Sequence, residues 1–174
     1  MFHRLALGSL LLAGSLWSVE PAWGPVLSGL SMGIALEGSA PGRLLRVTFR
    51  NQGTAPQAFV VGGKTGIGSI HGFESVSLAP DGTECKLLDL TVGGVAGYVE
   101  PIVVRLLPGQ TQSVTIATQK MFCMLGRQTL PLDGRLAAGH KLRVQFTAKD
   151  DSNEWGRVNP GWTGTLVSGT IAGK

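Results

Sequence analysis

The stretch that decides the fold is RLLRVTFR, residues 43–50. Its apolar residues at positions 45, 47 and 49 alternate with arginine or threonine at positions 46, 48 and 50. Because successive side chains of a β-strand leave opposite faces of the pleat, a period of two indicates a strand with one buried face. The stretch therefore predicts a half-buried β-strand.

The same pattern recurs along the chain. Alternation is found at residues 32–36, 111–116 and 142–147, and shorter β-like runs occupy residues 58–61, 73–78, 84–90, 102–107 and 163–171. Turn signals such as Pro80-Asp81-Gly82 separate the runs, since proline presets a turn dihedral angle and glycine accepts a positive φ. The pattern predicts an all-β domain, an antiparallel β-sandwich in which each sheet covers the apolar face of the other.

Length and composition agree with one globular domain. The chain has 174 residues, including 26 glycines, and is 43% hydrophobic but only 15% charged. Disordered tails combine high charge with little apolar content, coiled coils need an apolar heptad, and collagen needs a G-X-Y repeat, so all three classes are excluded. The net charge of the chain is +4. Nucleic-acid-binding proteins usually cluster their basic residues, whereas the basic residues of this chain are scattered, which disfavours nucleic-acid binding.

Residues 1–24 (MFHRLALGSLLLAGSLWSVEPAWG) have the pattern of a secretory signal peptide. Arg4 gives a positive start, and the apolar run over residues 5–17 is shorter than the roughly 20 residues with which a helix crosses a membrane. We expect a secreted or periplasmic protein with no transmembrane anchor after processing. A buried N-terminal helix is the alternative interpretation.

The cut site is open between residues 15 and 24. Small residues at 22 and 24 place it after Gly24, where Pro25 would follow the cut and usually blocks signal peptidase. The alternatives are cuts after residues 13–15 (AGS) and after residues 16–18 (LWS). With the cut after Gly24, the mature domain comprises residues 25–174.

Two segments depart from the strand pattern. Residues 61–72 (VGGKTGIGSIHG) carry five glycines and predict a mobile surface loop, and residues 149–164 form the most polar stretch of the chain. Loops at the ends of sandwiches commonly carry recognition, so we predict a contact surface at residues 62–72 and 149–164. Its candidate contact residues are Lys64, His71, Trp155 and Trp162.

Four runs resemble strands of bacterial secreted Ig-like β-sandwich domains. LLRVTFRNQGTAPQAF (44–59) is similar to their second strand and turn, and LLPGQTQSVTI (106–116) to their L-x-PG turn and the strand after it. LAAGHKLRVQF (136–146) resembles a G-x-Y-x-L-x-V strand with His140 in place of tyrosine, and GWTGTLVSGTI (161–171) resembles the closing strand. The resemblance implies an Ig-like fold and no particular activity, because such domains are adhesive, inhibitory or accessory.

Cys85 and Cys123 are the only cysteines of the chain. An even number in an exported chain favours pairing, because oxidising compartments stabilise disulfides. We therefore predict a Cys85–Cys123 disulfide. The alternative is a pair of buried free thiols on different strands, and the absence of a C-x-x-C motif disfavours a metal or redox pair.

Motifs for catalysis or cofactor binding are weak. Residues 58–65 (AFVVGGKT) match the loosest P-loop pattern, but the glycines that follow do not start the helix that phosphate binding needs. Ser69, His71 and Asp89 have the side chains of a hydrolytic triad without a G-x-S-x-G elbow, and residues 150–154 lack EF-hand spacing. We predict no catalytic residue, no cofactor and no metal site.

These observations favour an exported, non-enzymatic Ig-like domain with a binding, structural or accessory role. Its partner would be a protein or an envelope component, and not a nucleic acid. The alternatives act through the 62–72 and 149–164 loops: a protease inhibitor, a hydrolase that uses His71, or a carbohydrate-binding module with Trp155 and Trp162 as its platform.

Overall fold

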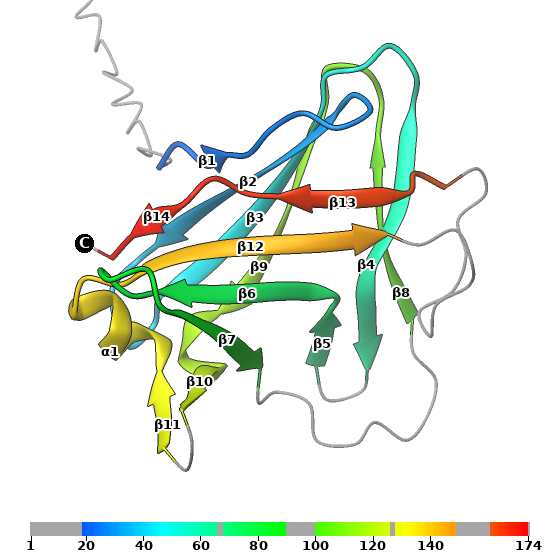
Figure 1. The fold of residues 1–174 in the computed structure, drawn as a ribbon. Coiled ribbons are helices and arrows are strands. Elements are labelled where there is room, and N and C mark those ends of the chain that lie inside the picture. The colour runs from blue at the N-terminus through cyan, green and yellow to red at the C-terminus, as the bar shows by residue number, and fades with distance from the viewer. Residues whose placement is uncertain (1–18, 66–67, 90–99, 126–127, 149–160, 174) are drawn as a thin grey trace, which may run out of the picture.

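The computed structural model describes residues 19–65, 68–89, 100–125, 128–148 and 161–173 (Figure 1). In these residues all strand pairs are antiparallel, and the helical elements are a 3-10 turn, η1 (Thr118–Lys120), and one short helix, α1 (Leu132–Ala137). The all-β prediction is confirmed. The described strands form three hydrogen-bonded sheets around one core.

The first sheet contains the strand that the alternating stretch at residues 43–50 predicts. Its strands, in order, are β1 (Ala22–Trp23), β2 (Leu30–Glu37), β3 (Leu44–Asn51) and β9 (Thr111–Ala117). The register places Val47 of β3 between Ile34 of β2 and Val114 of β9. Apolar positions of neighbouring strands therefore meet on one face, as the alternation predicts.

The second sheet crosses in front of the first in Figure 1. Its strands, in order, are β11 (Gln128–Pro131), β10 (Met121–Leu125), β7 (Glu84–Asp89), β6 (Phe73–Leu78), β12 (Lys141–Ala148) and β13 (Gly164–Val167), and β14 (Ile171–Ala172) also pairs with β12. The third sheet is smaller, with the order β5 (Gly68–His71), β4 (Gln57–Thr65) and β8 (Glu100–Leu106).

An aromatic cluster joins the three sheets. Phe49 of β3 lies with its ring centre 4.9 Å from that of Phe59 on β4, and Phe146 of β12 lies 5.7 Å from Phe49 and 5.5 Å from Phe59. All three side chains are at most 2% exposed. Each sheet contributes at least one phenylalanine to the cluster, so burial of these rings couples the sheets into a single core.

The glycine-rich segment at residues 61–72 is not the loop that the composition predicts. Strand β4 continues to Thr65, and β5 returns along it from Gly68 to His71. The ladder between β4 and β8 shifts its register between Val60 and Gly62, at the start of the glycine-rich run. Glycine weakens a strand signal in the sequence, but pairing on both sides of β4 supplies the backbone hydrogen bonds that keep it extended.

The folded chain starts earlier than residue 25. Strand β1 lies inside the segment predicted as a signal peptide, and pairs Ala22 with Ile34 and Trp23 with Gly33 of β2. A two-residue strand has too few positions to show an alternating pattern, so periodicity does not reveal it.

Candidate functional site

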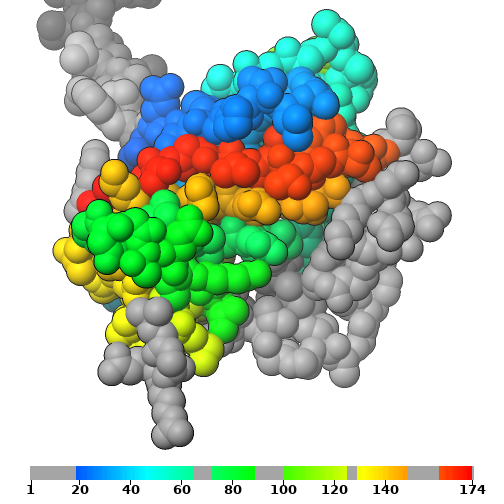
Figure 2. Space-filling view, in the orientation of Figure 1, coloured from blue at the N-terminus to red at the C-terminus, as the bar shows by residue number. Residues whose placement is uncertain are grey.

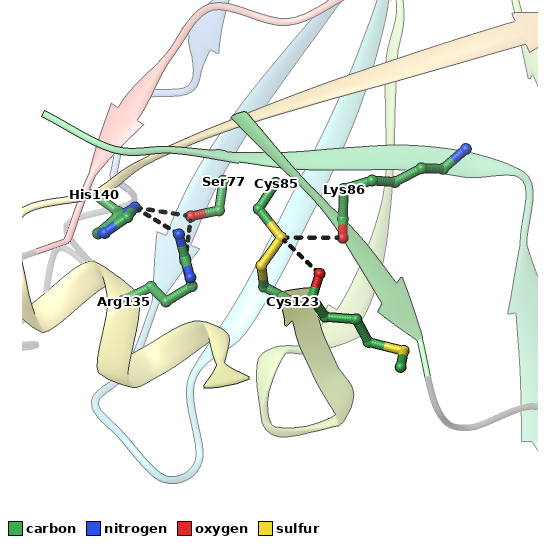
Figure 3. The surroundings of a disulfide bond; sticks show 7 residues. Ser77, Cys85, Lys86, Cys123, Arg135 and His140 are labelled. Carbon is green, nitrogen blue, oxygen red and sulfur yellow. Dashed lines mark hydrogen bonds between the residues drawn. A yellow bond between two sulfur atoms is a disulfide. The ribbon is translucent and has the colours of Figure 1, made fainter. Parts of the chain in front are cut away.

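The predicted disulfide joins two neighbouring strands of the second sheet (Figure 3). Cys85 of β7 and Cys123 of β10 are bonded, with 5.9 Å between their Cα atoms. Cys123 stands opposite Leu87 in the ladder, so the two cysteines are diagonal neighbours on one face of the sheet. Both are buried, at 5% and 0% exposure. The predicted pairing is confirmed, and the free-thiol alternative is wrong.

Three polar side chains lie beside this bond and hydrogen-bond to one another (Figure 3). Arg135 of α1 donates from Nε to Ser77 Oγ over 3.1 Å and from Nη2 to His140 Nδ1 over 3.3 Å. Ser77 Oγ lies 3.3 Å from the same His140 nitrogen. A guanidinium only donates, so Nδ1 of His140 accepts, and the neutral ring carries its proton on Nε2.

The surroundings of His140 favour this neutral form. Burial lowers the pKa of His140 below its usual 6.5, and the positive charge of Arg135 lowers it further. The carboxylate of Asp81, in the turn between β6 and β7, acts on this pKa in the opposite direction. The pKa of Asp81 is itself lowered, chiefly because the backbone N–H of Thr83 donates to its carboxylate over 2.9 Å.

This cluster holds the structure together and is not arranged for catalysis. Ser77 is 0% exposed and Arg135 7% exposed, so the serine hydroxyl does not reach a substrate in solvent. Instead the hydrogen bonds tie α1 to β6 and to the residue that precedes β12. No sequence motif marks the cluster, because Ser77 lies 58 positions from Arg135, although His140 follows Arg135 by only five.

The predicted contact residues have different surroundings. Lys64 is exposed near the end of β4, and His71 ends β5, where its backbone pairs with Gly62 and its side chain lies outside the described residues. Trp155 lies outside the described residues as well. The expectation for Trp162 is corrected: it is 7% exposed, and its ring centre lies 5.8 Å from that of Phe59, so it belongs to the core.

The backbone positions of the candidate hydrolytic triad lie on two different sheets. The backbone places Ser69 and His71 on β5 of the third sheet and Asp89 at the end of β7 in the second sheet. Their side chains, like residues 150–154, lie outside what the structure describes.

A pocket of about 450 Å³ opens between the end of β2 and the short strand β14. Its lining is mostly apolar and includes Val19, Leu36 and Ile171 together with one cation, Arg43. Nη1 of Arg43 lies 3.4 Å from Oδ1 of Asp133, so this charge is already paired with a carboxylate. The described lining suits an apolar group and offers no acid–base pair.

Across the described ranges, no group of three or more His, Cys, Asp and Glu side chains is placed to hold a metal ion. No helix among the same residues is long and apolar enough to cross a bilayer. In comparisons with protein-family models, curated proteins and solved structures, nothing matches this chain.

Proposed function

We propose that the chain is an exported, non-enzymatic domain of the Ig-like β-sandwich type, which binds a protein or an envelope component in a structural or accessory role. The observation that carries the proposal is the buried disulfide between β7 and β10. Disulfides persist in oxidising compartments and are rare where thiols are kept reduced. The apolar run at residues 5–17 supplies the export signal that such a location needs.

The arrangement of the polar side chains supports a binding role over a catalytic one. In the described Ser–His contact the serine is fully buried, and its hydroxyl accepts the hydrogen bond from Arg135 that attaches α1 to β6. Burial of Trp162 in the core also removes one of the two aromatics of the sugar-binding platform considered above. A protein contact therefore has more support than hydrolysis or glycan stacking.

The location is tested by expressing the full chain in a Gram-negative host and fractionating the cells. The expected product is a processed protein in the periplasmic fraction whose intact mass is 2 Da below that of its reduced form, because a disulfide lacks two hydrogens. A full-length chain with two free thiols in the cytoplasm would contradict the proposal.

The contact surface is tested by placing a photo-crosslinking residue at Lys64. Lys64 is exposed near the end of β4 in the third sheet, whereas the matched control position, Thr83, is exposed in the turn between β6 and β7 of the second sheet (Figure 1). We expect a single crosslinked species of fixed stoichiometry from position 64 and none from position 83. Equal labelling at both positions, or no adduct at either, would argue against a partner at this surface.

A further inference from the structure

The segment from Val19 to Gly24 is built into the first sheet. Ala22 and Trp23 form β1 against β2, and the N–H of Gly24 continues the ladder by donating to the carbonyl of Met32 over 2.9 Å. Arg46 of β3 donates from Nη2 to the carbonyl of Val19 over 2.6 Å. Each end of the segment is therefore fixed by a hydrogen bond to the sheet.

The same segment also contacts the second sheet. The N–H of Gly169, between β13 and β14, donates to the carbonyl of Ala22 over 3.0 Å. Gly24 lies so close to Val167 that a Cβ atom at position 24 would overlap the carbonyl group of that residue. Figure 2 shows the blue N-terminal segment lying along the red C-terminal strands. Strand β1 thus bridges the two larger sheets at this edge.

Trp23 covers the outer face of β2 and β3. A Cβ atom added to Gly33 would lie 2.8 Å from Cε3 of Trp23, and the guanidinium carbon of Arg50 lies 4.0 Å from the centre of the indole ring. Ser31 and Ala35 stand on the same outward face as Gly33, yet each is only 1% exposed. Trp23 therefore covers the part of this face around Gly33 and Arg50.

We propose that export processing cuts the chain after Ser15 and leaves β1 in the mature protein. The inference rests on the proposed export, since it assumes that a leader is removed. A cut after Gly24 would delete β1 and remove Trp23 from Gly33 of β2 and Arg50 of β3. Of the two upstream sites, the one ending at Ser15 has small residues at both recognition positions, Ala13 and Ser15, whereas the one ending at Ser18 has Leu16 at the first of them.

The chemical step is the hydrolysis of one peptide bond. A membrane-bound signal peptidase adds water across the bond between Ser15 and Leu16, which leaves a carboxylate on Ser15 and an amine on Leu16. The departing leader keeps the whole positive start and most of the apolar run. The mature chain keeps all the described residues that contact β2, β3 and Gly169 from the N-terminal side.

The site is tested by intact-mass analysis and N-terminal sequencing of the full chain exported from a Gram-negative host. We expect Leu16 as the first residue, loss of this species in Ser15→Leu, and an unchanged N-terminus in the matched control Ser18→Leu. Exported protein that begins at Val19 or Pro25 would overturn this proposal alone. Unprocessed protein retained in the cytoplasm would overturn the proposed function along with it.

The role of β1 is tested separately on the exported protein with two glycine substitutions. Gly33→Ala places a methyl group against Trp23, whereas Gly42→Ala has no heavy atom nearer than the carbonyl oxygen of Ser39 at 3.9 Å. We expect Gly33→Ala to lower the melting temperature by about 4 °C or more and Gly42→Ala to change it by about 1 °C or less. Equal melting temperatures for the two variants would show that β1 does not stabilise the domain.

Discussion

Reduction of the Cys85–Cys123 disulfide is expected to lower the free energy of unfolding by about 4 kcal/mol. The bond joins cysteines separated by 38 positions in the chain. In the chain-entropy account, a crosslink that closes a loop of this length removes about 13 cal/mol/K from the unfolded ensemble, which corresponds to about 4 kcal/mol at 25 °C. Reduction removes no side-chain atom from the core, so loop entropy is the main difference between the two states.

The assay is urea unfolding followed by tryptophan fluorescence, on oxidised protein and on protein refolded in a phosphine reductant. With a urea dependence of about 2 kcal/mol/M, the unfolding midpoint should fall by about 2 M on reduction. The control is the double variant Cys85→Ala, Cys123→Ala, whose midpoint should be the same with and without reductant. Wild-type midpoints that differ by less than about 0.3 M would refute the loop-entropy reasoning.

Three further predictions follow from the described contacts. Phe146→Ala should lower the free energy of unfolding in urea by about 3–5 kcal/mol, because it empties the junction of the three sheets, and a change below about 1 kcal/mol would contradict that central role. Asn51→Ala should lower the free energy of unfolding by about 1–3 kcal/mol, because it removes the 3.1 Å hydrogen bond from Nδ2 to the carbonyl of Leu106 at a fully buried site. Thermal melts of this variant that coincide with those of the wild type would contradict this prediction. The lowered pKa of His140, caused by burial and by Arg135, predicts that stability is full above pH 6.5 and falls as the pH drops below it, because the unfolded ring then binds the proton more readily. Urea midpoints from pH 7.5 to 5 should show a drop that is reduced in His140→Gln, and an equal drop in both proteins would assign the effect to other groups.

Much of the strand content was predictable because the alternating pattern is local. Residues 73–78 form β6 with the expected bounds, and residues 43–50 differ from β3 by one position at each end. The β4–β5 hairpin was predicted as a loop, because glycines carry no apolar side chain from which a period is read. The helix α1 is six residues long, too short for a helical period to appear in the sequence.

The candidate site was less predictable than the fold. The disulfide could be predicted because the chain has only two cysteines, so only one pairing within the chain exists. The burial of Trp162 depends on Phe59, more than a hundred positions away, and the cluster around Arg135 depends on Ser77 in a separate strand. Contacts between residues so distant in the chain leave no spacing rule that a single sequence reveals.

By itself, the sequence determined the all-β class, the positions of most strands and the pairing of the two cysteines, because side-chain period and cysteine number are properties of the chain. Only the tertiary structure decided that three sheets share one core, that Trp162 lies inside it, and that residues 22 and 23 pair with β2. The physical reason is that burial and backbone pairing depend on which surfaces meet in space. For β1 those surfaces are β2 and the segment around Gly169, at two distant points of the chain.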